Sequence, residues 1–202
     1  ARNSFIKSAW IRVVERRNFK RAAGIHFTSD LEADAARYYL PASLKRQAII
    51  PNGVESEAEI NHTPGFAKRD VALYLGRINW KKNIGDLINS IACLENLKLI
   101  VAGPADQDEL DKLNMLVRER NLGHRVTFCG AVDSQQKGKL LARAKALVLC
   151  SVNENFGNVV VEALAAGCPV VVNESVGAAA LVKRHDAGVV IEADNLSLTD
   201  AI

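Results

Sequence analysis

A nine-residue stretch between two apolar runs, ENFGNVVVE, combines two carboxylates with a glycine turn and the start of a helix. The pattern predicts a helix that begins at Asn158, and the unpaired N–H groups and partial positive charge of its first turn would favour an anion such as phosphate. Gly157 would let a ligand approach the backbone closely. Glu154 precedes the helix and Glu162 lies inside it, and ionised carboxylates are good acceptors for sugar hydroxyl groups. The stretch therefore predicts a ligand that carries both phosphate and hydroxyl groups.

A simpler interpretation makes both carboxylates ordinary helix charges, with Glu162 exposed and Glu154 interacting with the helix dipole. The composition of the helix argues against this interpretation, because valine, alanine and leucine residues surround Glu162 in the sequence. A helix this apolar should be largely buried, so its carboxylate needs a partner or a pocket.

A second segment, GRINWKKN at residues 76–83, follows another apolar run and supplies Arg77, Lys81 and Lys82. Arginine presents a planar fork of donors and lysine a compact charge, a pair suited to a diphosphate. The segment matches neither the dinucleotide-binding pattern GxGxxG nor the P-loop pattern GxxxxGK[ST]. Taken alone, it is more simply interpreted as a solvated turn that opens a helix.

From residue 71 onwards, short apolar runs alternate with stretches of helical period. This alternation predicts βαβ units, and continuous apolar strands indicate a sheet that is covered on both faces. The predicted fold class is therefore α/β, a Rossmann-like parallel sheet with helices on both faces. Ligands bind outside the carboxyl ends of the strands in such a sheet, and both segments follow a predicted strand. The predicted strands are 71–75, 97–102, 125–129, 146–150, 169–172 and 188–191, and the predicted helices are 84–94, 108–120, 134–143, 158–166 and 178–184.

The chain before residue 71 is organised differently. Two short apolar runs and a helix, capped by Ser29 or Asp30, precede a Pro-Asn-Gly turn and a polar segment at 55–69 that reads as a linker. We therefore predict two parts, residues 1–60 and residues 61–202. The predicted elements of the first part are strands at 22–28 and 47–50 and a helix at 30–40.

The composition limits the possible functions. With 26 Lys and Arg against 23 Asp and Glu, the net charge of +3 is too small to indicate nucleic-acid binding. The four cysteines form no CxxC pair and the four histidines have no ligand spacing, so we predict neither disulfides nor a metal site, and we expect a reducing compartment. The triplet Asp106-Gln107-Asp108 resembles a metal-binding DxD, but its position favours helix capping and first-turn charge.

No apolar run reaches transmembrane length, and no signal peptide is visible. Both ends of the chain interrupt helical patterns, so we expect it to be part of a longer protein. Residues 2–21 are locally basic. This stretch is more simply one solvated helix face, and the alternative is contact with an anionic membrane surface or with a missing partner segment.

These segments together resemble the retaining, GT-B-fold glycosyltransferases called glycosyl transferases group 1. The resemblance is carried by Gly76-Arg77 followed by Lys82, and by Glu154 and Glu162 separated by seven residues that include Phe156-Gly157, ahead of EALAAGCPVVV. Upstream, HFTSDLEAD and IIPNGVE resemble the segment that leads to the interdomain linker of the family.

The resemblance implies a role for each matching residue. Arg77 and Lys82 would bind the donor diphosphate and neutralise charge as the sugar leaves. Glu154 would hold hydroxyl groups of the transferred sugar and complete the catalytic set, and Glu162 would hold the ribose hydroxyl groups. Further donor contacts are expected from Gly76, Asn155, Phe156, Gly157, Asn158 and Val159, and contacts near the base from Gly130 and Val132.

The resemblance further implies that this chain is the donor-binding half of a glycosyltransferase. The donor would be a nucleotide-diphosphate sugar, without a cofactor or a metal, and a missing N-terminal domain would bind a glycan or lipid-linked acceptor. We expect the fragment alone to bind the donor weakly and to transfer nothing. The family suggests polysaccharide biosynthesis in the cytoplasm, with peripheral contact at the membrane face. Two alternatives stay open: a non-catalytic nucleotide-sugar-binding module, and another GT-B enzyme such as an epimerase or a phosphorylase.

Overall fold

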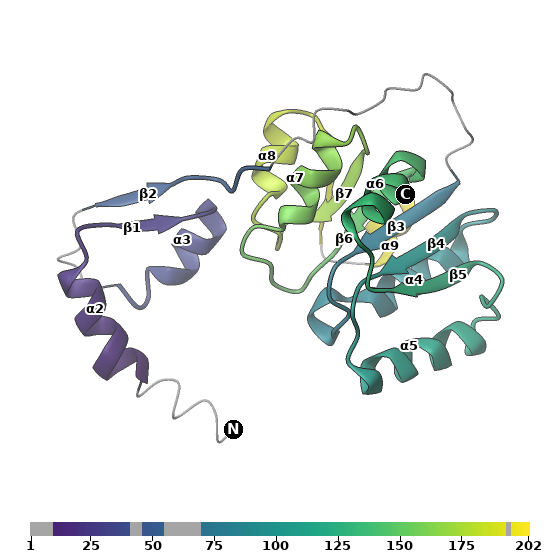
Figure 1. The fold of residues 1–202 in the computed structure, drawn as a ribbon, viewed down its shortest axis with the longest axis horizontal. Coiled ribbons are helices and arrows are strands. Elements are labelled where there is room, and N and C mark those ends of the chain that lie inside the picture. The colour runs from purple at the N-terminus through teal and green to yellow at the C-terminus, as the bar shows by residue number, and fades with distance from the viewer. Residues whose placement is uncertain (1–9, 41–45, 55–69, 193–194) are drawn as a thin grey trace. The chain divides into compact units, whose positions relative to one another are not determined.

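The computed structural model divides the chain into two compact units, Ala1–Asn52 and Gly53–Ile202, which are considered separately. The predicted linker at 55–69, with the predicted boundary at residue 60, lies outside the described residues. The structure describes residues 10–40, 46–54, 70–192 and 195–202 (Figure 1).

The first unit contains a two-stranded parallel sheet, β1 (Ile25–Phe27) and β2 (Gln47–Ile49), with α3 (Asp30–Ala36) between them in sequence. Both predicted strands are confirmed, although they are shorter than predicted. The helix predicted at 30–40 ends at Ala36, and a turn follows. Of the two candidate caps, Ser29 is the N-cap, because its Oγ accepts a hydrogen bond from the N–H of Glu32.

Two helical segments precede β1. They are a π-helical turn, η1 (Ile11–Glu15), and α2 (Arg16–Arg21). The side chains of Arg17, Lys20 and Arg21 are exposed, as expected for a solvated helix face.

The second unit is built on a six-stranded sheet with the order β5-β4-β3-β6-β7-β8, in which every neighbouring pair is parallel. The chain adds strands outward from β3, returns to the other side of β3, and then continues outward in the opposite direction (Figure 1). The order therefore reverses between β3 and β6. The strands are β3 (Val71–Leu75), β4 (Lys98–Ala102), β5 (Val126–Gly130), β6 (Ala146–Leu149), β7 (Val170–Asn173) and β8 (Gly188–Ile191).

Helices connect consecutive strands of this sheet. Because parallel crossovers are right-handed, the reversal places α4 (Ile84–Cys93) and α5 (Gln107–Glu119) on one face of the sheet. It places α6 (Ser134–Arg143), α7 (Asn158–Ala165) and α8 (Ala179–Arg184) on the other face. The predicted α/β fold is confirmed, and each predicted strand and helix of this unit lies within one residue of its observed bounds. The helices are η2 (Trp80–Lys82), α4 (Ile84–Cys93), α5 (Gln107–Glu119), α6 (Ser134–Arg143), α7 (Asn158–Ala165), α8 (Ala179–Arg184) and α9 (Asn195–Ala201).

The core lies on both faces of the central strands. Every residue of β3, β6 and β7 is buried, which explains why these strands are continuous apolar runs in the sequence. Cys150 and Cys168 are buried beside these strands, whereas Cys93 and Cys129 are exposed, and all four are free thiols. Burial, with a smaller contribution from the negative charge of Asp86, raises the pKa of the Cys150 thiol to about 12.

Backbone hydrogen bonds continue the sheet into the loops at its carboxyl edge. The N–H of Gly103 donates to the carbonyl of Gly130 at 2.7 Å, and the N–H of Gly76 donates to the carbonyl of Ala102 at 3.0 Å. One step further out, the N–H of Ile78 donates to the carbonyl of Pro104 at 2.8 Å. The loops that follow β3, β4 and β5 are therefore held in register with one another.

A second set of backbone hydrogen bonds extends this arrangement across the reversal. The N–H of Val152, after β6, donates to the carbonyl of Lys81 at 2.8 Å. The N–H of Glu154 donates to the carbonyl of Ser175 at 3.0 Å, and the N–H of Gly177 donates to the carbonyl of Glu154 at 2.9 Å. The loops after β3, β6 and β7 are thus joined through their main chains.

Two glycines allow the loops after β3 and β4 to lie this close. Gly76 and Gly103 both have a φ of 146°, which L side chains rarely adopt. A Cβ atom at Gly103 would lie only 1.9 Å from the carbonyl oxygen of Gly76. The separation of these two loops therefore depends on the absence of a side chain at residue 103.

The Tyr74 hydroxyl holds the loop that follows β3 through one hydrogen bond. Tyr74 is buried in β3, and its hydroxyl donates to the carbonyl of Arg77 at 2.9 Å. Burial raises the pKa of Tyr74 well above its usual range, and the negative charge of Glu154 raises it further. The phenol therefore keeps the proton that it donates to the loop.

We expect Gly103→Ala to lower the free energy of unfolding by roughly 2–4 kcal/mol, because overpacking and backbone strain each cost about 1–3 kcal/mol. Urea denaturation followed by circular dichroism measures the change. Gly138→Ala is the matched control, because Gly138 lies inside α6 and nothing would contact its Cβ within 4 Å. Equal stabilities for the two variants would contradict the close approach of the loops.

We expect Tyr74→Phe to lower the free energy of unfolding by about 0.5–1.5 kcal/mol, because the part-buried hydrogen bond from the hydroxyl to the Arg77 carbonyl is lost. The tyrosinate absorbance of the folded protein near pH 10, where an ordinary tyrosine ionises, should be the same in the variant and the wild type. A loss of this absorbance in Tyr74→Phe would mean that Tyr74 ionises with an ordinary pKa.

Candidate functional site

The predicted residues lie in the loops that follow parallel strands and in the helices that begin directly after these loops, and so near one edge of the sheet. Residues 76–83 follow β3 and residues 151–157 follow β6, the two strands between which the order reverses. In open α/β sheets this reversal is where ligands bind. Residues 174–178, after β7, are joined to the second loop by the hydrogen bonds of Glu154 described above.

The two segments singled out in the sequence meet through an ion pair. Lys82 Nζ donates to Glu154 Oε2, and the two side chains are 20% and 23% exposed. The residues are 72 positions apart in the chain. Each was assigned to a ligand by the resemblance, and in this structure each neutralises the other. A ligand with an anionic part and hydroxyl groups would find a cation and an acceptor at one place.

The turn that carries Lys82 is built by two asparagines. Asn79 accepts a hydrogen bond from the N–H of Lys81 and so caps η2. Asn83 then adopts a left-handed conformation with a φ of 54°, and its Nδ2 donates to Asp86 Oδ2 at 2.6 Å. These local bonds aim the end of η2 at the loop after β6.

Arg77 lies in the same loop and is exposed. Its carbonyl accepts from Tyr74, and the next residue, Ile78, is 1% exposed. The backbone at Arg77 is therefore held by the Tyr74 hydroxyl and by the buried residue that follows it. Within the described residues the Arg77 side chain forms no ion pair, so its positive charge is not neutralised by the protein.

Glu162 has a partner that the sequence analysis missed. Lys137 Nζ, on α6, donates to Glu162 Oε2 at 3.0 Å, and the side chains are 36% and 31% exposed. The prediction that a carboxylate on this apolar helix needs a partner or a pocket is confirmed. No sequence signal selected Lys137, because the pair joins two helices from different βαβ units.

The turn before α7 depends on a glycine. Gly157 occupies the N-cap position with a φ of 86°, and a Cβ atom there would lie 3.0 Å from Val176 Cγ1 and 3.1 Å from Leu149 Cδ2. Phe156 is 3% exposed, so its side chain belongs to the core and only its backbone is available to a ligand. The other predicted contacts at this helix start are exposed at Asn155 and Asn158 and half-buried at Val159.

The residues expected near a base also lie at the carboxyl edge. Gly130 ends β5 with a φ of 68°, and nothing would contact a Cβ atom there within 4 Å. Val132 is half-buried, and Asp133 next to it caps α6. This loop leads directly to the helix that carries Lys137.

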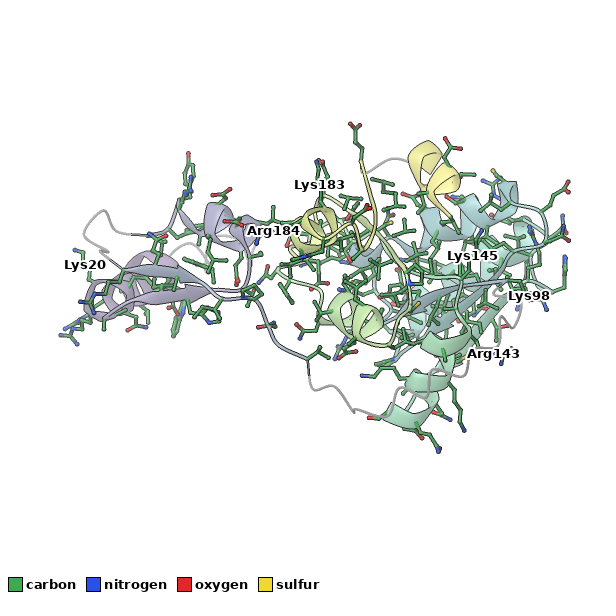
Figure 2. All side chains as sticks on the ribbon, turned by 90° about the horizontal axis from the view of Figure 1, so that it is seen from above. Lys20, Lys98, Arg143, Lys145, Lys183 and Arg184 are labelled. Atoms are coloured by element: carbon green, nitrogen blue, oxygen red, sulfur yellow. The ribbon has the colours of Figure 1, made fainter. Side chains whose placement is uncertain are left out.

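The cations of the site are separate from those at the other end of the strands. Lys98 begins β4, and Arg143 and Lys145 lie between the end of α6 and the start of β6, so all three belong to the amino edge (Figure 2). Arg77 and Lys82 follow strand ends instead. The cations of the site therefore come from the loop after β3 and, at Lys137, from the first turn of the helix after β5.

The triplet at 106–108 lies at the start of α5. Asp106 occupies the N-cap position of α5, but its side chain makes no capping hydrogen bond, so the capping role predicted for it is wrong. Asp108 lies in the first turn, as predicted. Across the described ranges, no group of three or more His, Cys, Asp and Glu residues could hold a metal ion. The helices of the same ranges include none with the length and apolarity needed to span a bilayer.

Known proteins of similar sequence and structure are glycosyltransferases and sucrose-phosphate synthase. The phosphatidyl-myo-inositol mannosyltransferase of Mycobacterium leprae is 30% identical over 185 residues, which cover 84% of this chain and 47% of that protein. Sucrose-phosphate synthase from Thermosynechococcus elongatus is 28% identical with a TM-score of 0.81, over 93% of this chain and 50% of that one.

A further solved structure is HepE from Anabaena in complex with UDP and glucose. It is 25% identical with a TM-score of 0.79, over 94% of this chain and 55% of that chain. This chain thus spans about half the length of these relatives. Residues 56–201 match the family described as Glycosyl transferases group 1. This protein therefore belongs to the glycosyl transferases group 1 family and has the α/β fold of the GT-B glycosyltransferases that its sequence resembles.

Proposed function

We propose that this chain supplies the nucleotide-sugar donor site of a retaining glycosyltransferase. The observation that carries the proposal is the pairing of Lys82 with Glu154 at the switch point, beside an arginine that has no ion pair within the described residues. Cations for a diphosphate and acceptors for hydroxyl groups thus come from adjoining loops.

In this proposal Arg77 and Lys82 bind the diphosphate of the donor. Transfer breaks the bond between the sugar and the phosphate oxygen, and negative charge develops on the departing diphosphate. The two cations would stabilise that charge more in the transition state than in the bound donor. Because they neutralise it without a metal ion, the transfer is proposed to be metal-independent.

The two carboxylates would accept hydrogen bonds from the hexose and the ribose of the donor. Glu154 is joined through its main chain to the loop after β7, so its carboxylate is well positioned to accept from hydroxyl groups of the transferred hexose. Glu162, on α7, would accept from the ribose. When the donor binds, the diphosphate would replace the Glu154 carboxylate as the partner of Lys82, and the hexose hydroxyl groups would replace Lys82 as partners of Glu154.

The acceptor side of the reaction would lie outside this chain. Relatives of about twice its length include a mannosyltransferase named for phosphatidyl-myo-inositol, and a glycan or lipid-linked acceptor is proposed on that basis. Peripheral contact with the cytoplasmic face of a membrane would fit such an acceptor. Transfer requires donor and acceptor in one closed site, so the 202-residue chain alone should bind donor weakly and transfer nothing.

Isothermal titration of the chain with UDP, GDP and ADP tests the donor site. We expect saturable binding of one of them, weakened at least about tenfold by Arg77→Ala and by Glu162→Ala, because hydrogen bonds to charged groups contribute about 1.5–3 kcal/mol. Arg118→Ala is the matched control, because Arg118 is exposed in the last turn of α5, at the other edge of the sheet. Binding that survives both site substitutions, or sugar transfer by this chain alone, would contradict the proposal.

The proposed absence of a metal requirement gives a separate prediction. The affinity for the bound nucleotide should agree within about twofold in EDTA and in magnesium, because Arg77 and Lys82 supply the charge that a metal would otherwise supply. The same titration measures both values. A loss of binding in EDTA would contradict metal-independent recognition.

A further inference from the structure

We propose that Lys137 is a positioning residue for Glu162, and that it holds the carboxylate ready for the ribose of a nucleotide. The inference rests on the proposed donor site, in which Glu162 accepts from the ribose. It adds a residue from α6, which lies outside the loops and the helix start that the family resemblance selected.

The ion pair places Lys137 against one oxygen of Glu162 only. Lys137 Nζ donates to Oε2 at 3.0 Å, and within the described residues Oε1 of Glu162 has no hydrogen-bond partner. An ionised carboxylate offers about four acceptor sites on its two oxygens. Glu162 can therefore keep Lys137 and accept from hydroxyl groups at the same time, so the lysine and the ribose do not have to compete.

Lys137 is itself fixed by the start of its helix. Asp133 Oδ1 accepts from the N–H of Gln136 at 2.7 Å, and Gln136 Oε1 accepts from the N–H of Asp133 at 3.0 Å, which forms a complete capping box. The N–H of Lys137 donates to the carbonyl of Asp133 at 2.9 Å. The backbone of Lys137 is thus hydrogen-bonded to the loop after β5, where the base is expected to bind.

The surroundings of Glu162 explain why it needs this lysine. Glu162 is the single ionisable residue of α7, whose sequence is NVVVEALA, and its side chain is 31% exposed. Its own helix carries no cation that could pair with the carboxylate, and a glutamate on a partly open surface samples several rotamers. Lys137 restricts that sampling before the ligand arrives, which reduces the ordering cost of binding.

The test compares a ribonucleotide with its deoxyribonucleotide. The probes are UDP, GDP and ADP, and for whichever binds most tightly, its 2′-deoxy counterpart. Lys137→Met removes the ammonium and keeps most of the apolar stem, and Lys137→Arg keeps the charge. Lys139→Met is the control, because Lys139 is exposed on the same helix and forms no ion pair within the described residues. Thermal unfolding confirms that each variant is folded.

We expect Lys137→Met to reduce the preference for ribose over deoxyribose by about two- to fivefold, as befits a partly exposed ion pair. The affinity for the 2′-deoxy probe, which keeps only the 3′-hydroxyl, should fall less than the affinity for the ribonucleotide. Lys137→Arg should restore most of the preference, and Lys139→Met should match the wild type. In a Glu162→Ala background, Lys137→Met should have no further effect, because the two residues act through one carboxylate.

Other outcomes overturn the inference in distinguishable ways. An unchanged ribose preference in Lys137→Met, while the wild type binds the nucleotide, rejects the positioning role and leaves the donor site intact. Tighter ribose binding in Lys137→Met would mean that the lysine competes with the ligand, which also rejects it. If the wild type binds none of the three diphosphates, the proposed donor site fails, and the role of Lys137 fails with it.

Discussion

The main-chain hydrogen bonds between the carboxyl-edge loops determine where the side chains of this site lie. They continue the parallel sheet past its last strand residues, from Gly130 through Gly103 and Gly76, and they cross the reversal of strand order between Lys81 and Val152. Side chains on loops usually lose precision because loops move independently. Here the loops share hydrogen bonds, so the residues they carry keep their spacing as the strands do.

On this rigid edge the charges occur as matched pairs. Lys82 faces Glu154 and Lys137 faces Glu162, and each pair is partly shielded from water. An unpaired charge in a half-buried position would lose hydration without compensation. Pairing lets the protein hold four ionised groups together before any ligand is present, while Arg77 remains in solvent. The site thus contains both cations, which suit phosphate groups, and carboxylates, which suit hydroxyl groups.

The fold was predicted closely from the sequence because the buried strands are short apolar runs bounded by glycine, proline or polar turns. The residues next to each strand therefore indicate where it begins and ends. The loops after these strands, together with the family resemblance, selected Arg77, Lys82, Glu154 and Glu162 as candidate site residues. The pairing of these residues could not be predicted in the same way, because Lys82 and Glu154 are 72 positions apart and meet only through the strand order. Lys137 was missed for a similar reason, since a lysine on an amphipathic helix looks like any solvated residue. Helix α3 is shorter than predicted, and Asp106 occupies the N-cap position of α5 without forming a capping hydrogen bond. Helix ends therefore depend on side-chain geometry that residue type alone does not determine.

The tight turn at Gly157 has a consequence for anyone who would transplant this site. Its glycine lies against Val176 from the loop after β7 and Leu149 from the end of β6, and Phe156 beside it is part of the core. The nine residues from Glu154 to Glu162 are therefore not a portable module. Grafted onto another sheet without those two neighbours, the same letters would lose the surface that shapes the turn, and the two carboxylates would no longer keep their present separation.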